Sequence, residues 1–208
     1  MRRLPITTRR PRAAAVALGG ALAALGLALG VVGGAPAAAD EAGGGDALVP
    51  CAERAEAGDG SVSVVSVSGL LDPVVARLVD RSIAAAEDDG RSWVVFQVNS
   101  GGSAVGDERL ASLVERVREA SVAVGVWVGP SGSRASGGMA QIASVACAVG
   151  VSPGSRLGDT GRPVVAEERL NPPFAAALDR LESGTVDADA ALELGLATGE
   201  APVIGSFL

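Results

Sequence analysis

The sequence contains no lysine and no histidine, so all 17 of its basic side chains are arginines. Without histidine the chain cannot form a Ser-His-Asp triad, and without histidine or clustered cysteines we expect no metal site. Arginine cannot serve as a general base in their place, because the pKa of its guanidinium lies above about 12. Aromatic residues make up only 2 % of the chain, so we expect an aliphatic core.

The N-terminal segment has the pattern of an export signal. Five arginines precede an uncharged run of Ala, Leu, Gly and Val at residues 13–35, which is followed by three alanines and Asp40. Cleavage after Ala39 and retention as a membrane anchor are both open, because a run of 23 apolar residues can also cross a bilayer core of about 30 Å. Residues 1–39 are therefore interpreted as a signal peptide or an N-terminal anchor. Either one places the rest on the extracytoplasmic face of the cell membrane or in the secreted fraction.

The chain beyond this segment is acidic. Residues 1–39 hold five of the 17 basic side chains and none of the 24 acidic ones, which leaves a formal charge of −12 on the remainder. A negative surface repels phosphate backbones, so we expect no nucleic-acid partner. The 169 residues after Ala39 are enough for one domain with a sizeable core.

Residues 40–60 are mostly Ala, Gly, Asp and Glu, a composition that predicts a flexible lead-in with Cys51 free to move. A disulfide between Cys51 and Cys147 stays open as an alternative, since an exported chain would preserve it. Against it, Cys147 lies in an apolar stretch, where a cysteine is often a small buried hydrophobe. The folded domain is predicted over residues 61–208.

Strand and helix patterns alternate along this domain. Strands are predicted at residues 61–68, 93–98, 122–128 and 146–151, and helices at 72–89, 107–119, from 136 onward, 171–182 and 187–194. Residues 61–68 alternate Ser with Val, whereas residues 93–98 form a continuous apolar run, which indicates burial on both faces, and the connections are short. We therefore expect an α/β fold with a mainly parallel sheet and crossover helices.

Two glycine-rich loops follow predicted strands. The first, residues 99–103, contains Gly101 and Gly102, a pair whose backbone N–H groups can face a substrate without a side chain between. The second, residues 132–139, places Ser136 at the start of a helix. Taken singly, a glycine pair is usually a turn and such a serine is usually a helix cap. Their order and spacing together favour a catalytic site.

Residues 64–161 resemble the protease domain of NfeD-type membrane-bound serine proteases. The motifs that carry the resemblance are Gly-Leu-Leu-Asp-Pro at 69–73, Asn-Ser-Gly-Gly at 99–102, Val-Trp-Val-Gly-Pro at 126–130, Arg-Ala-Ser-Gly-Gly at 134–138 and Ser-Pro-Gly-Ser-Arg-Leu-Gly at 152–158. Residues 185–203 also resemble the end of that domain.

This resemblance implies a ClpP/crotonase-like fold with Ser136 as the nucleophile. The oxyanion donors would be backbone N–H groups of Gly101, Gly102 and Gly137. No cofactor is implied, and the substrates would be apolar peptide segments of membrane proteins, bound as an added strand. Assembly into a homo-oligomer is left open, as is contact with the membrane through an uncleaved N-terminal segment.

The sequence departs from that family at the general base. The family uses a lysine between the Ser-Pro-Gly loop and the last helix, and none is present. Asp159, Glu167 and Glu168 are the nearest candidates for a substitute, although an ordinary carboxylate with a pKa near about 4 is a weak base. Two functions stay open: a serine peptidase that uses such a carboxylate, and a catalytically silent peptide-binding or scaffolding homologue. Acyl-CoA chemistry on the same fold is disfavoured, because export removes the CoA pool.

Overall fold

The computed structural model describes residues 48–208. The predicted signal peptide or anchor, residues 1–39, and the first part of the predicted lead-in, residues 40–47, lie outside this range. Among the helices of residues 48–208, none has both the length and the apolar character needed to span a bilayer.

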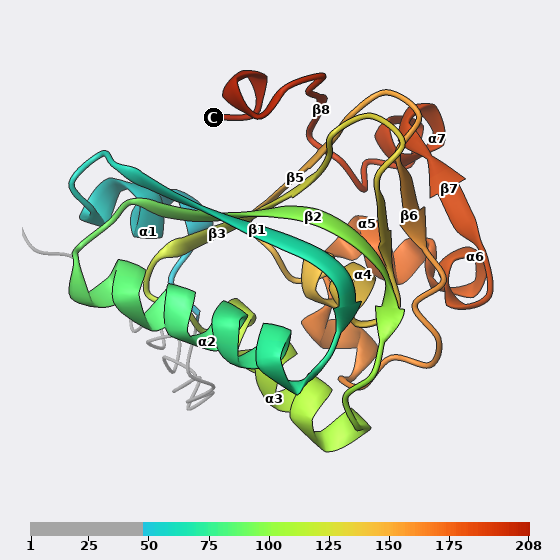
Figure 1. Ribbon diagram of the computed structural model, residues 1–208, viewed down its shortest axis with the longest axis horizontal. Coiled ribbons are helices and arrows are strands. Elements are labelled where there is room, and N and C mark those ends of the chain that lie inside the picture. Colours follow the sequence, from blue (N-terminus) through green and yellow to red (C-terminus); the bar gives the residue numbers. More distant parts are fainter. Residues whose placement is uncertain (1–47) are drawn as a thin grey trace, which may run out of the picture. The chain divides into compact units, whose positions relative to one another are not determined.

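Within residues 48–208, eight strands form one sheet in the order β7-β6-β4-β2-β3-β5-β8, and β1 pairs with β2 (Figure 1). The strands are β1 (Val62–Leu71), β2 (Trp93–Ser103), β3 (Ala123–Val128), β4 (Arg134–Ser136), β5 (Ala148–Val151), β6 (Arg156–Gly158), β7 (Thr185–Asp187) and β8 (Gly199–Glu200). Every pairing is parallel except that of β6 with β7. The predicted mainly parallel sheet is confirmed.

The connecting helices begin where the sequence predicts. The helices are α1 (Cys51–Ala57), α2 (Pro73–Asp88), α3 (Asp107–Arg118), α4 (Gly138–Ala143), α5 (Pro172–Ala176), α6 (Leu178–Glu182) and α7 (Ala188–Glu193), with short 3₁₀ turns η1 (Glu167–Arg169) and η2 (Ile204–Ser206). Asp72 caps α2, because its side chain accepts hydrogen bonds from the N–H groups of Val74 and Val75. In Figure 1, α2 and α3 lie next to each other on one face of the sheet.

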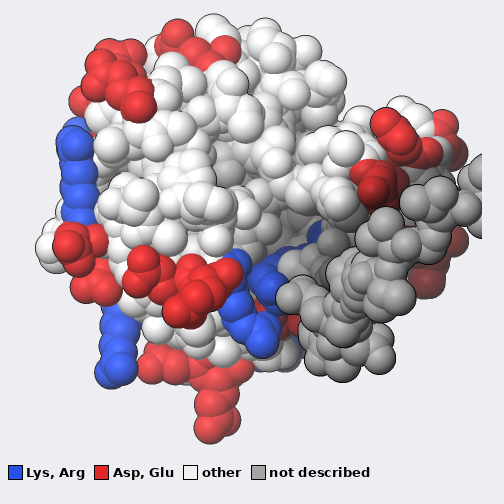
Figure 2. Space-filling view, turned by 180° about the vertical axis from the view of Figure 1, so that it is seen from behind, with Lys and Arg blue, Asp and Glu red and all other residues white. Residues whose placement is uncertain are grey.

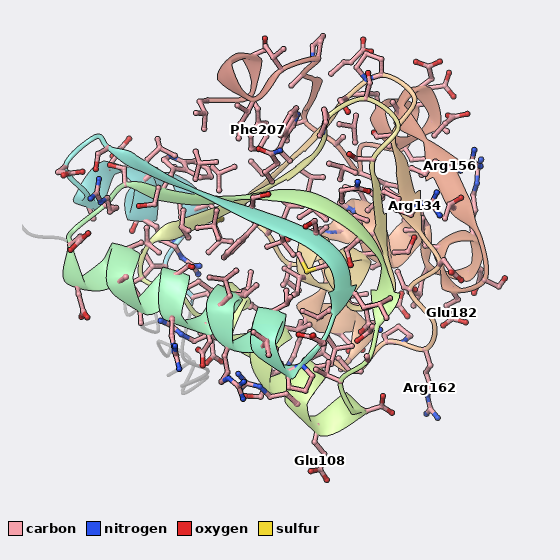
Figure 3. All side chains as sticks on the ribbon, viewed as in Figure 1. Glu108, Arg134, Arg156, Arg162, Glu182 and Phe207 are labelled. Carbon is pink, nitrogen blue, oxygen red and sulfur yellow. A yellow bond between two sulfur atoms is a disulfide. The ribbon has the colours of Figure 1, made fainter. Side chains whose placement is uncertain are left out.

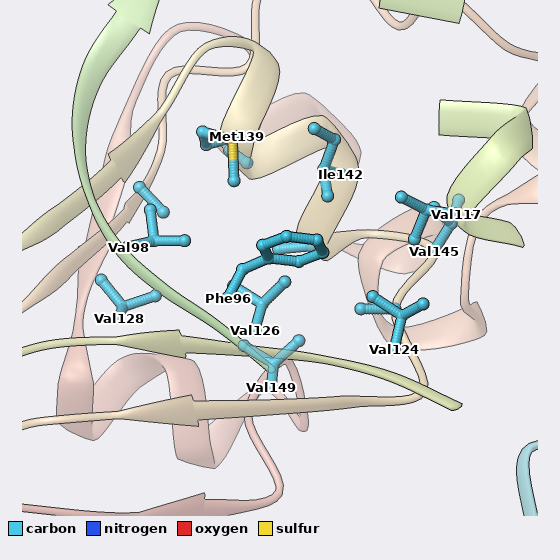
Figure 4. Packing of buried hydrophobic residues seen from close by; sticks show 14 of the residues in the cluster. Phe96, Val98, Val117, Val124, Val126, Val128, Met139, Ile142, Val145 and Val149 are labelled. Carbon is cyan, nitrogen blue, oxygen red and sulfur yellow. The ribbon is translucent and has the colours of Figure 1, made fainter. Parts of the chain in front are cut away.

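Phe96 of β2 occupies the middle of the main core and is fully buried. Figure 4 shows its ring between valines of the neighbouring strands and the side chains of Met139 and Ile142 on α4. The rest of this core is almost entirely aliphatic, as the composition predicts. Packing of this kind fixes α4, and with it the turn before α4, against the end of β2.

The opposite face of β3 and β5 is covered by the C-terminal segment. The Phe207 ring packs where Gly125 and Gly150 carry no side chain: a Cβ built on Gly150 would lie 2.4 Å from the Cδ2 atom of Phe207 (Figure 3). Beside it, the indole N–H of Trp127 donates a 2.9 Å hydrogen bond to the carbonyl of Ala201. This second, smaller apolar cluster covers the part of this face formed by Val95, Trp127 and Ala201.

Three local predictions need correction. β2 continues to Ser103, through a stretch expected to be a loop, and a short strand β4 precedes Ser136. The reason is a long-range pairing of Ser100 with Ala135, which local patterns cannot reveal. The helix expected over residues 171–182 is divided into α5 and α6 at Ala177.

The predicted flexible lead-in is wrong for residues 51–57, which form α1. A disulfide joins Cys51 to Cys147, with their Cα atoms 5.5 Å apart. Arg54 of α1 is buried, and its Nε donates a 2.7 Å hydrogen bond to the carbonyl of Val49. Burial lowers the pKa of Arg54, and the nearby charge of Arg118 lowers it further. The prediction from composition failed because α1 has little apolar surface of its own. The disulfide attaches it to the rest of the domain.

Candidate functional site

Ser136 lies on a tight strand-turn-helix connection, as predicted. β4 ends at Ser136, and α4 begins two residues later at Gly138. Gly137 between them has φ 60° and ψ −128°, a conformation that side-chain-bearing residues rarely adopt. The chain therefore needs a glycine directly after this serine in order to turn into α4.

The turn after Ser136 lies in contact with the Gly101–Gly102 loop, which the sequence predicted from their order alone. Ala135 pairs with Ser100 in the sheet. A Cβ built on Gly137 would lie 3.2 Å from the Cα of Gly102. A substrate carbonyl placed at Ser136 would thus lie next to the backbone of this loop, the arrangement that an oxyanion hole requires.

The predicted oxyanion donors differ in their availability. The N–H of Gly137 donates a 2.9 Å hydrogen bond to the carbonyl of Asp159. In this structure it is therefore not available to donate a hydrogen bond to a substrate oxygen. Gly101 is exposed and Gly102 is half-buried. Ser136 itself is only 5 % exposed, and its hydroxyl has no hydrogen-bond partner among residues 48–208. Within residues 48–208, no carboxylate is hydrogen-bonded to the Ser136 hydroxyl.

Of the three carboxylates predicted as substitute bases, Asp159 is the one next to the serine turn. It directly follows β6, in which Gly158 pairs with Ser136. Asp159 has φ 49° and is exposed, and its N–H donates a hydrogen bond of 2.6 Å to the carbonyl of Gly184. A non-glycine residue with positive φ is uncommon, so its backbone bonds on both sides hold Asp159 in a sparsely populated conformation.

Glu167 and Glu168 lie elsewhere. Both are exposed residues of η1. Glu168 lines a hollow of about 290 Å³ together with Cys51 and Arg54 of α1, at a distance in the fold from the two loops of the site. The structure does not bring these two carboxylates together with Ser136.

The surface of residues 48–208 has two further hollows. One of about 380 Å³ runs between the start of α3, at Asp107 and Glu108, and the segment after β6, at Arg162. The other, of about 370 Å³, lies against the C-terminal segment and is lined by Trp93 and Phe207. Neither hollow is lined by Ser136, Gly101, Gly102 or Asp159.

Sequence reasoning missed Arg134 and Arg156, two exposed arginines on the strands next to Ser136. Figure 3 shows both on the side of the molecule formed by β4, β6 and β7. Arg134 belongs to the Arg-Ala-Ser-Gly-Gly motif, so strand alternation around Ser136 could have identified it. Among residues 48–208, no group of three acidic or cysteine side chains is arranged to hold a metal ion.

Comparison with known proteins gives structural neighbours only. No family model and no curated protein matches the sequence. The membrane-bound stomatin-specific protease 1510-N from Pyrococcus horikoshii is similar in structure, with a TM-score of 0.59 at 20 % identity over 71 % of this chain and 76 % of that chain. A mutant of 1510-N in complex with a substrate peptide has a TM-score of 0.60 at 17 % identity, over 70 % and 77 % of the two chains.

An enoyl-CoA hydratase/isomerase from Marinobacter aquaeolei is also similar, with a TM-score of 0.52 at 13 % identity over 70 % of this chain and 69 % of that chain. Both kinds of neighbour share the expected architecture. The chain has the ClpP/crotonase-like fold, and its structural neighbours include an NfeD-like protease, as the sequence motifs predict.

Proposed function

We propose that this chain is an exported or membrane-associated NfeD-like serine peptidase domain, which binds an extended peptide segment of a membrane protein over Ser136. The contact between the serine turn and the Gly101–Gly102 loop is the observation that carries the proposal. The likeness to a stomatin-specific protease that was crystallised with a substrate peptide supports the substrate class. Acyl-CoA chemistry has only the fold in its favour.

In the proposed reaction the Oγ atom of Ser136 attacks the peptide carbonyl carbon, and its proton passes to the carboxylate of Asp159. The carbonyl oxygen becomes an oxyanion, which N–H groups of the Gly101–Gly102 loop stabilise. The protonated Asp159 then gives the proton to the leaving amine as the C–N bond breaks. Water hydrolyses the resulting ester by the same steps, with Asp159 again as the base.

A second candidate, a catalytically silent peptide-binding domain, is favoured by two observations. The chain has no lysine or histidine to accept the serine proton. In addition, the N–H of Gly137 is occupied by the carbonyl of Asp159, which leaves the oxyanion site one donor short. Loss of an efficient general base typically lowers a rate by ~10²–10⁴, so we expect slow turnover at most.

The deciding experiment compares the full chain with its Ser136→Ala variant on an apolar peptide and with a fluorophosphonate that labels activated serines. Asp159→Asn, which removes the base and keeps the side-chain size, forms the third arm, and Glu168→Gln is its matched control at an unrelated carboxylate. Peptide binding is measured for all four proteins by fluorescence anisotropy.

Cleavage and labelling that vanish in Ser136→Ala, and fall sharply in Asp159→Asn but not in Glu168→Gln, would support the peptidase with Asp159 as its base. Equal and very low cleavage in all proteins, with peptide binding retained, would support the silent binding domain. If none of the proteins bound a peptide, both readings of the site would be refuted.

A further inference from the structure

We propose that the surface around Ser136 selects peptides with an acidic side chain, because Arg134 and Arg156 stand on the same face as the serine and would bind its carboxylate. This inference rests on the proposed function, since it assumes that a peptide lies over Ser136. It changes the expected substrate from a purely apolar segment to an apolar segment that carries a carboxylate near the reacting bond.

The strand pattern places the two arginines and the serine on one face. Arg134 and Ser136 are two residues apart in β4, so their side chains leave the strand on the same side. Ala135, which lies between them, is fully buried in the main core. The side of β4 that carries Arg134 and Ser136 is therefore the side that faces away from this core. On β6 the same alternation holds: Arg156 pairs with Arg134 and is exposed, whereas the next residue, Leu157, is buried.

The Arg134 side chain also reaches toward the predicted oxyanion loop. A Cβ built on Gly101 would lie 3.7 Å from the Cδ atom of Arg134, so the aliphatic part of this side chain passes beside the loop. The backbone N–H of Arg134 donates a 3.3 Å hydrogen bond to Oδ1 of Asn99, which fixes the strand there. The aliphatic part of the Arg134 side chain therefore lies beside the Gly101–Gly102 segment, while its guanidinium makes no hydrogen bond or ion pair within residues 48–208.

Within residues 48–208, neither guanidinium forms an ion pair. Five arginines of the described chain form ion pairs, and Arg134 and Arg156 are not among them. Nε of Arg156 donates a 2.9 Å hydrogen bond to the hydroxyl of Thr185, an uncharged partner. Like charges on paired strands repel each other, so a carboxylate bound near both arginines would relieve this repulsion.

The carboxylates of Asp187 and Asp159 lie closest to this region in the sheet, and within residues 48–208 neither forms an ion pair with Arg134 or Arg156. Asp187 is opposite Arg156 in the β6–β7 ladder, but its Oδ1 accepts a 3.0 Å hydrogen bond from the N–H of Ala190 at the start of α7. Asp159 is exposed at the far end of β6 and is in no ion pair within residues 48–208. Figure 3 also labels Glu182 on this side, farther along the chain from either arginine.

The spacing predicts where the acidic residue would stand in the peptide. Arg134 precedes Ser136 by two residues, which corresponds to about 6.6 Å along a strand. Both edges of β4 are already paired, with β2 and with β6, so an extended peptide would cross the exposed face over β4 and place its carboxylate about two residues from the bond at Ser136. Guanidinium groups bind carboxylates through paired hydrogen bonds, so a single Asp or Glu suits the two arginines.

The test measures binding of two fluorescent peptides to the full chain in the Ser136→Ala background, which prevents hydrolysis. One peptide is apolar with a single central Asp, and the other has Asn in its place. We expect the Asp peptide to bind roughly fivefold to tenfold more tightly at low salt, with the difference shrinking as salt is added. Arg134→Gln and Arg156→Gln should each reduce this ratio, and the double variant should bring it near one.

Arg81→Gln is the matched control, because Arg81 is an exposed arginine of α2 that forms no ion pair within residues 48–208. It should leave the ratio unchanged. Equal affinity for the two peptides would overturn the acidic preference and leave the proposed peptide site intact. A preference that persists in the double variant would also overturn it. Failure of both peptides to bind would refute the site itself, and with it this inference.

Discussion

Removal of the disulfide between Cys51 and Cys147 should strongly destabilise the domain. The bond closes a loop across 96 residues of sequence, so in the unfolded chain it removes much conformational freedom. For a loop of about 100 residues the chain-entropy estimate is about 4.7 kcal/mol, and native bridges typically contribute about 2–4 kcal/mol. We therefore expect the free energy of unfolding to fall by about 3–5 kcal/mol in the Cys51→Ala, Cys147→Ala double variant.

Urea denaturation of the oxidised chain, the reduced chain and the double variant measures this loss. The reduced chain and the double variant should agree, because both lack the same constraint. For a domain of this size each kcal/mol corresponds to about 2–4 °C in Tm, so a shift of roughly 6–20 °C should accompany the loss. A loss below about 1 kcal/mol would refute the reasoning, since the tether would then not limit the unfolded chain. Mass spectrometry under non-reducing conditions checks independently that the bond is formed.

Three further predictions concern stability. Phe96→Ala should cost about 3–5 kcal/mol, because it empties the centre of the core, and chemical denaturation measures it. Gly158→Ala should cost about 1–3 kcal/mol, since its Cβ would lie 2.3 Å from the carbonyl oxygen of Gly184. Burial acts to raise the pKa of Glu87, but hydrogen bonds from Arg116 and from a backbone amide outweigh it and hold this pKa below its ordinary value. The ionised Glu87 therefore stabilises the domain above about pH 4.3, and this contribution should disappear as the pH falls through the lowered pKa.

Each of these predictions has its own control. Leu70→Ala removes an apolar side chain that is 56 % exposed, and should change stability by less than about 0.5 kcal/mol. A comparable loss for Leu70 and Phe96 would contradict the assignment of the core. Gly205→Ala, where a Cβ meets nothing within 4 Å, controls for the glycine substitution. For Glu87, the Glu87→Gln variant should lose stability at neutral pH, and its free energy of unfolding should fall less steeply as the pH is lowered. If the acid part of this pH profile were unchanged, another carboxylate would be responsible for it.

Much of the fold could be predicted because its signals are local. The capping Asp72 and the proline after it mark the start of α2, and the apolar run at residues 93–98 marks a doubly buried strand, so both were predicted from neighbouring residues alone. The turn into α4 was equally local, since two glycines follow Ser136 directly, although the helix begins at Gly138 and not at Ser136 as predicted. In each case the residue types needed for the backbone conformation occur within a few positions of one another.

The predictions that were wrong concern structure that depends on residues distant in the sequence. The extension of β2 and the existence of β4 both come from the pairing of Ser100 with Ala135. Helix α1 depends on a bond between Cys51 and Cys147, whose geometry no local composition expresses. Sequence alone could not place the strand pairing, and it could name the disulfide only as an alternative, because whether the two cysteines meet depends on how the distant segments pack.

The sequence by itself determined which chemistry is available: a serine in a glycine-rich turn, no lysine or histidine to activate it, and an α/β alternation that leads to this fold. Only the tertiary structure decided which of the three acidic candidates follows the strand next to Ser136, that the N–H of Gly137 is already bonded to the backbone carbonyl of Asp159, and that Arg134 and Arg156 share the face of Ser136. Composition and spacing fix what each side chain can do, whereas register and burial, which arise from the packing of distant segments, fix which side chains meet.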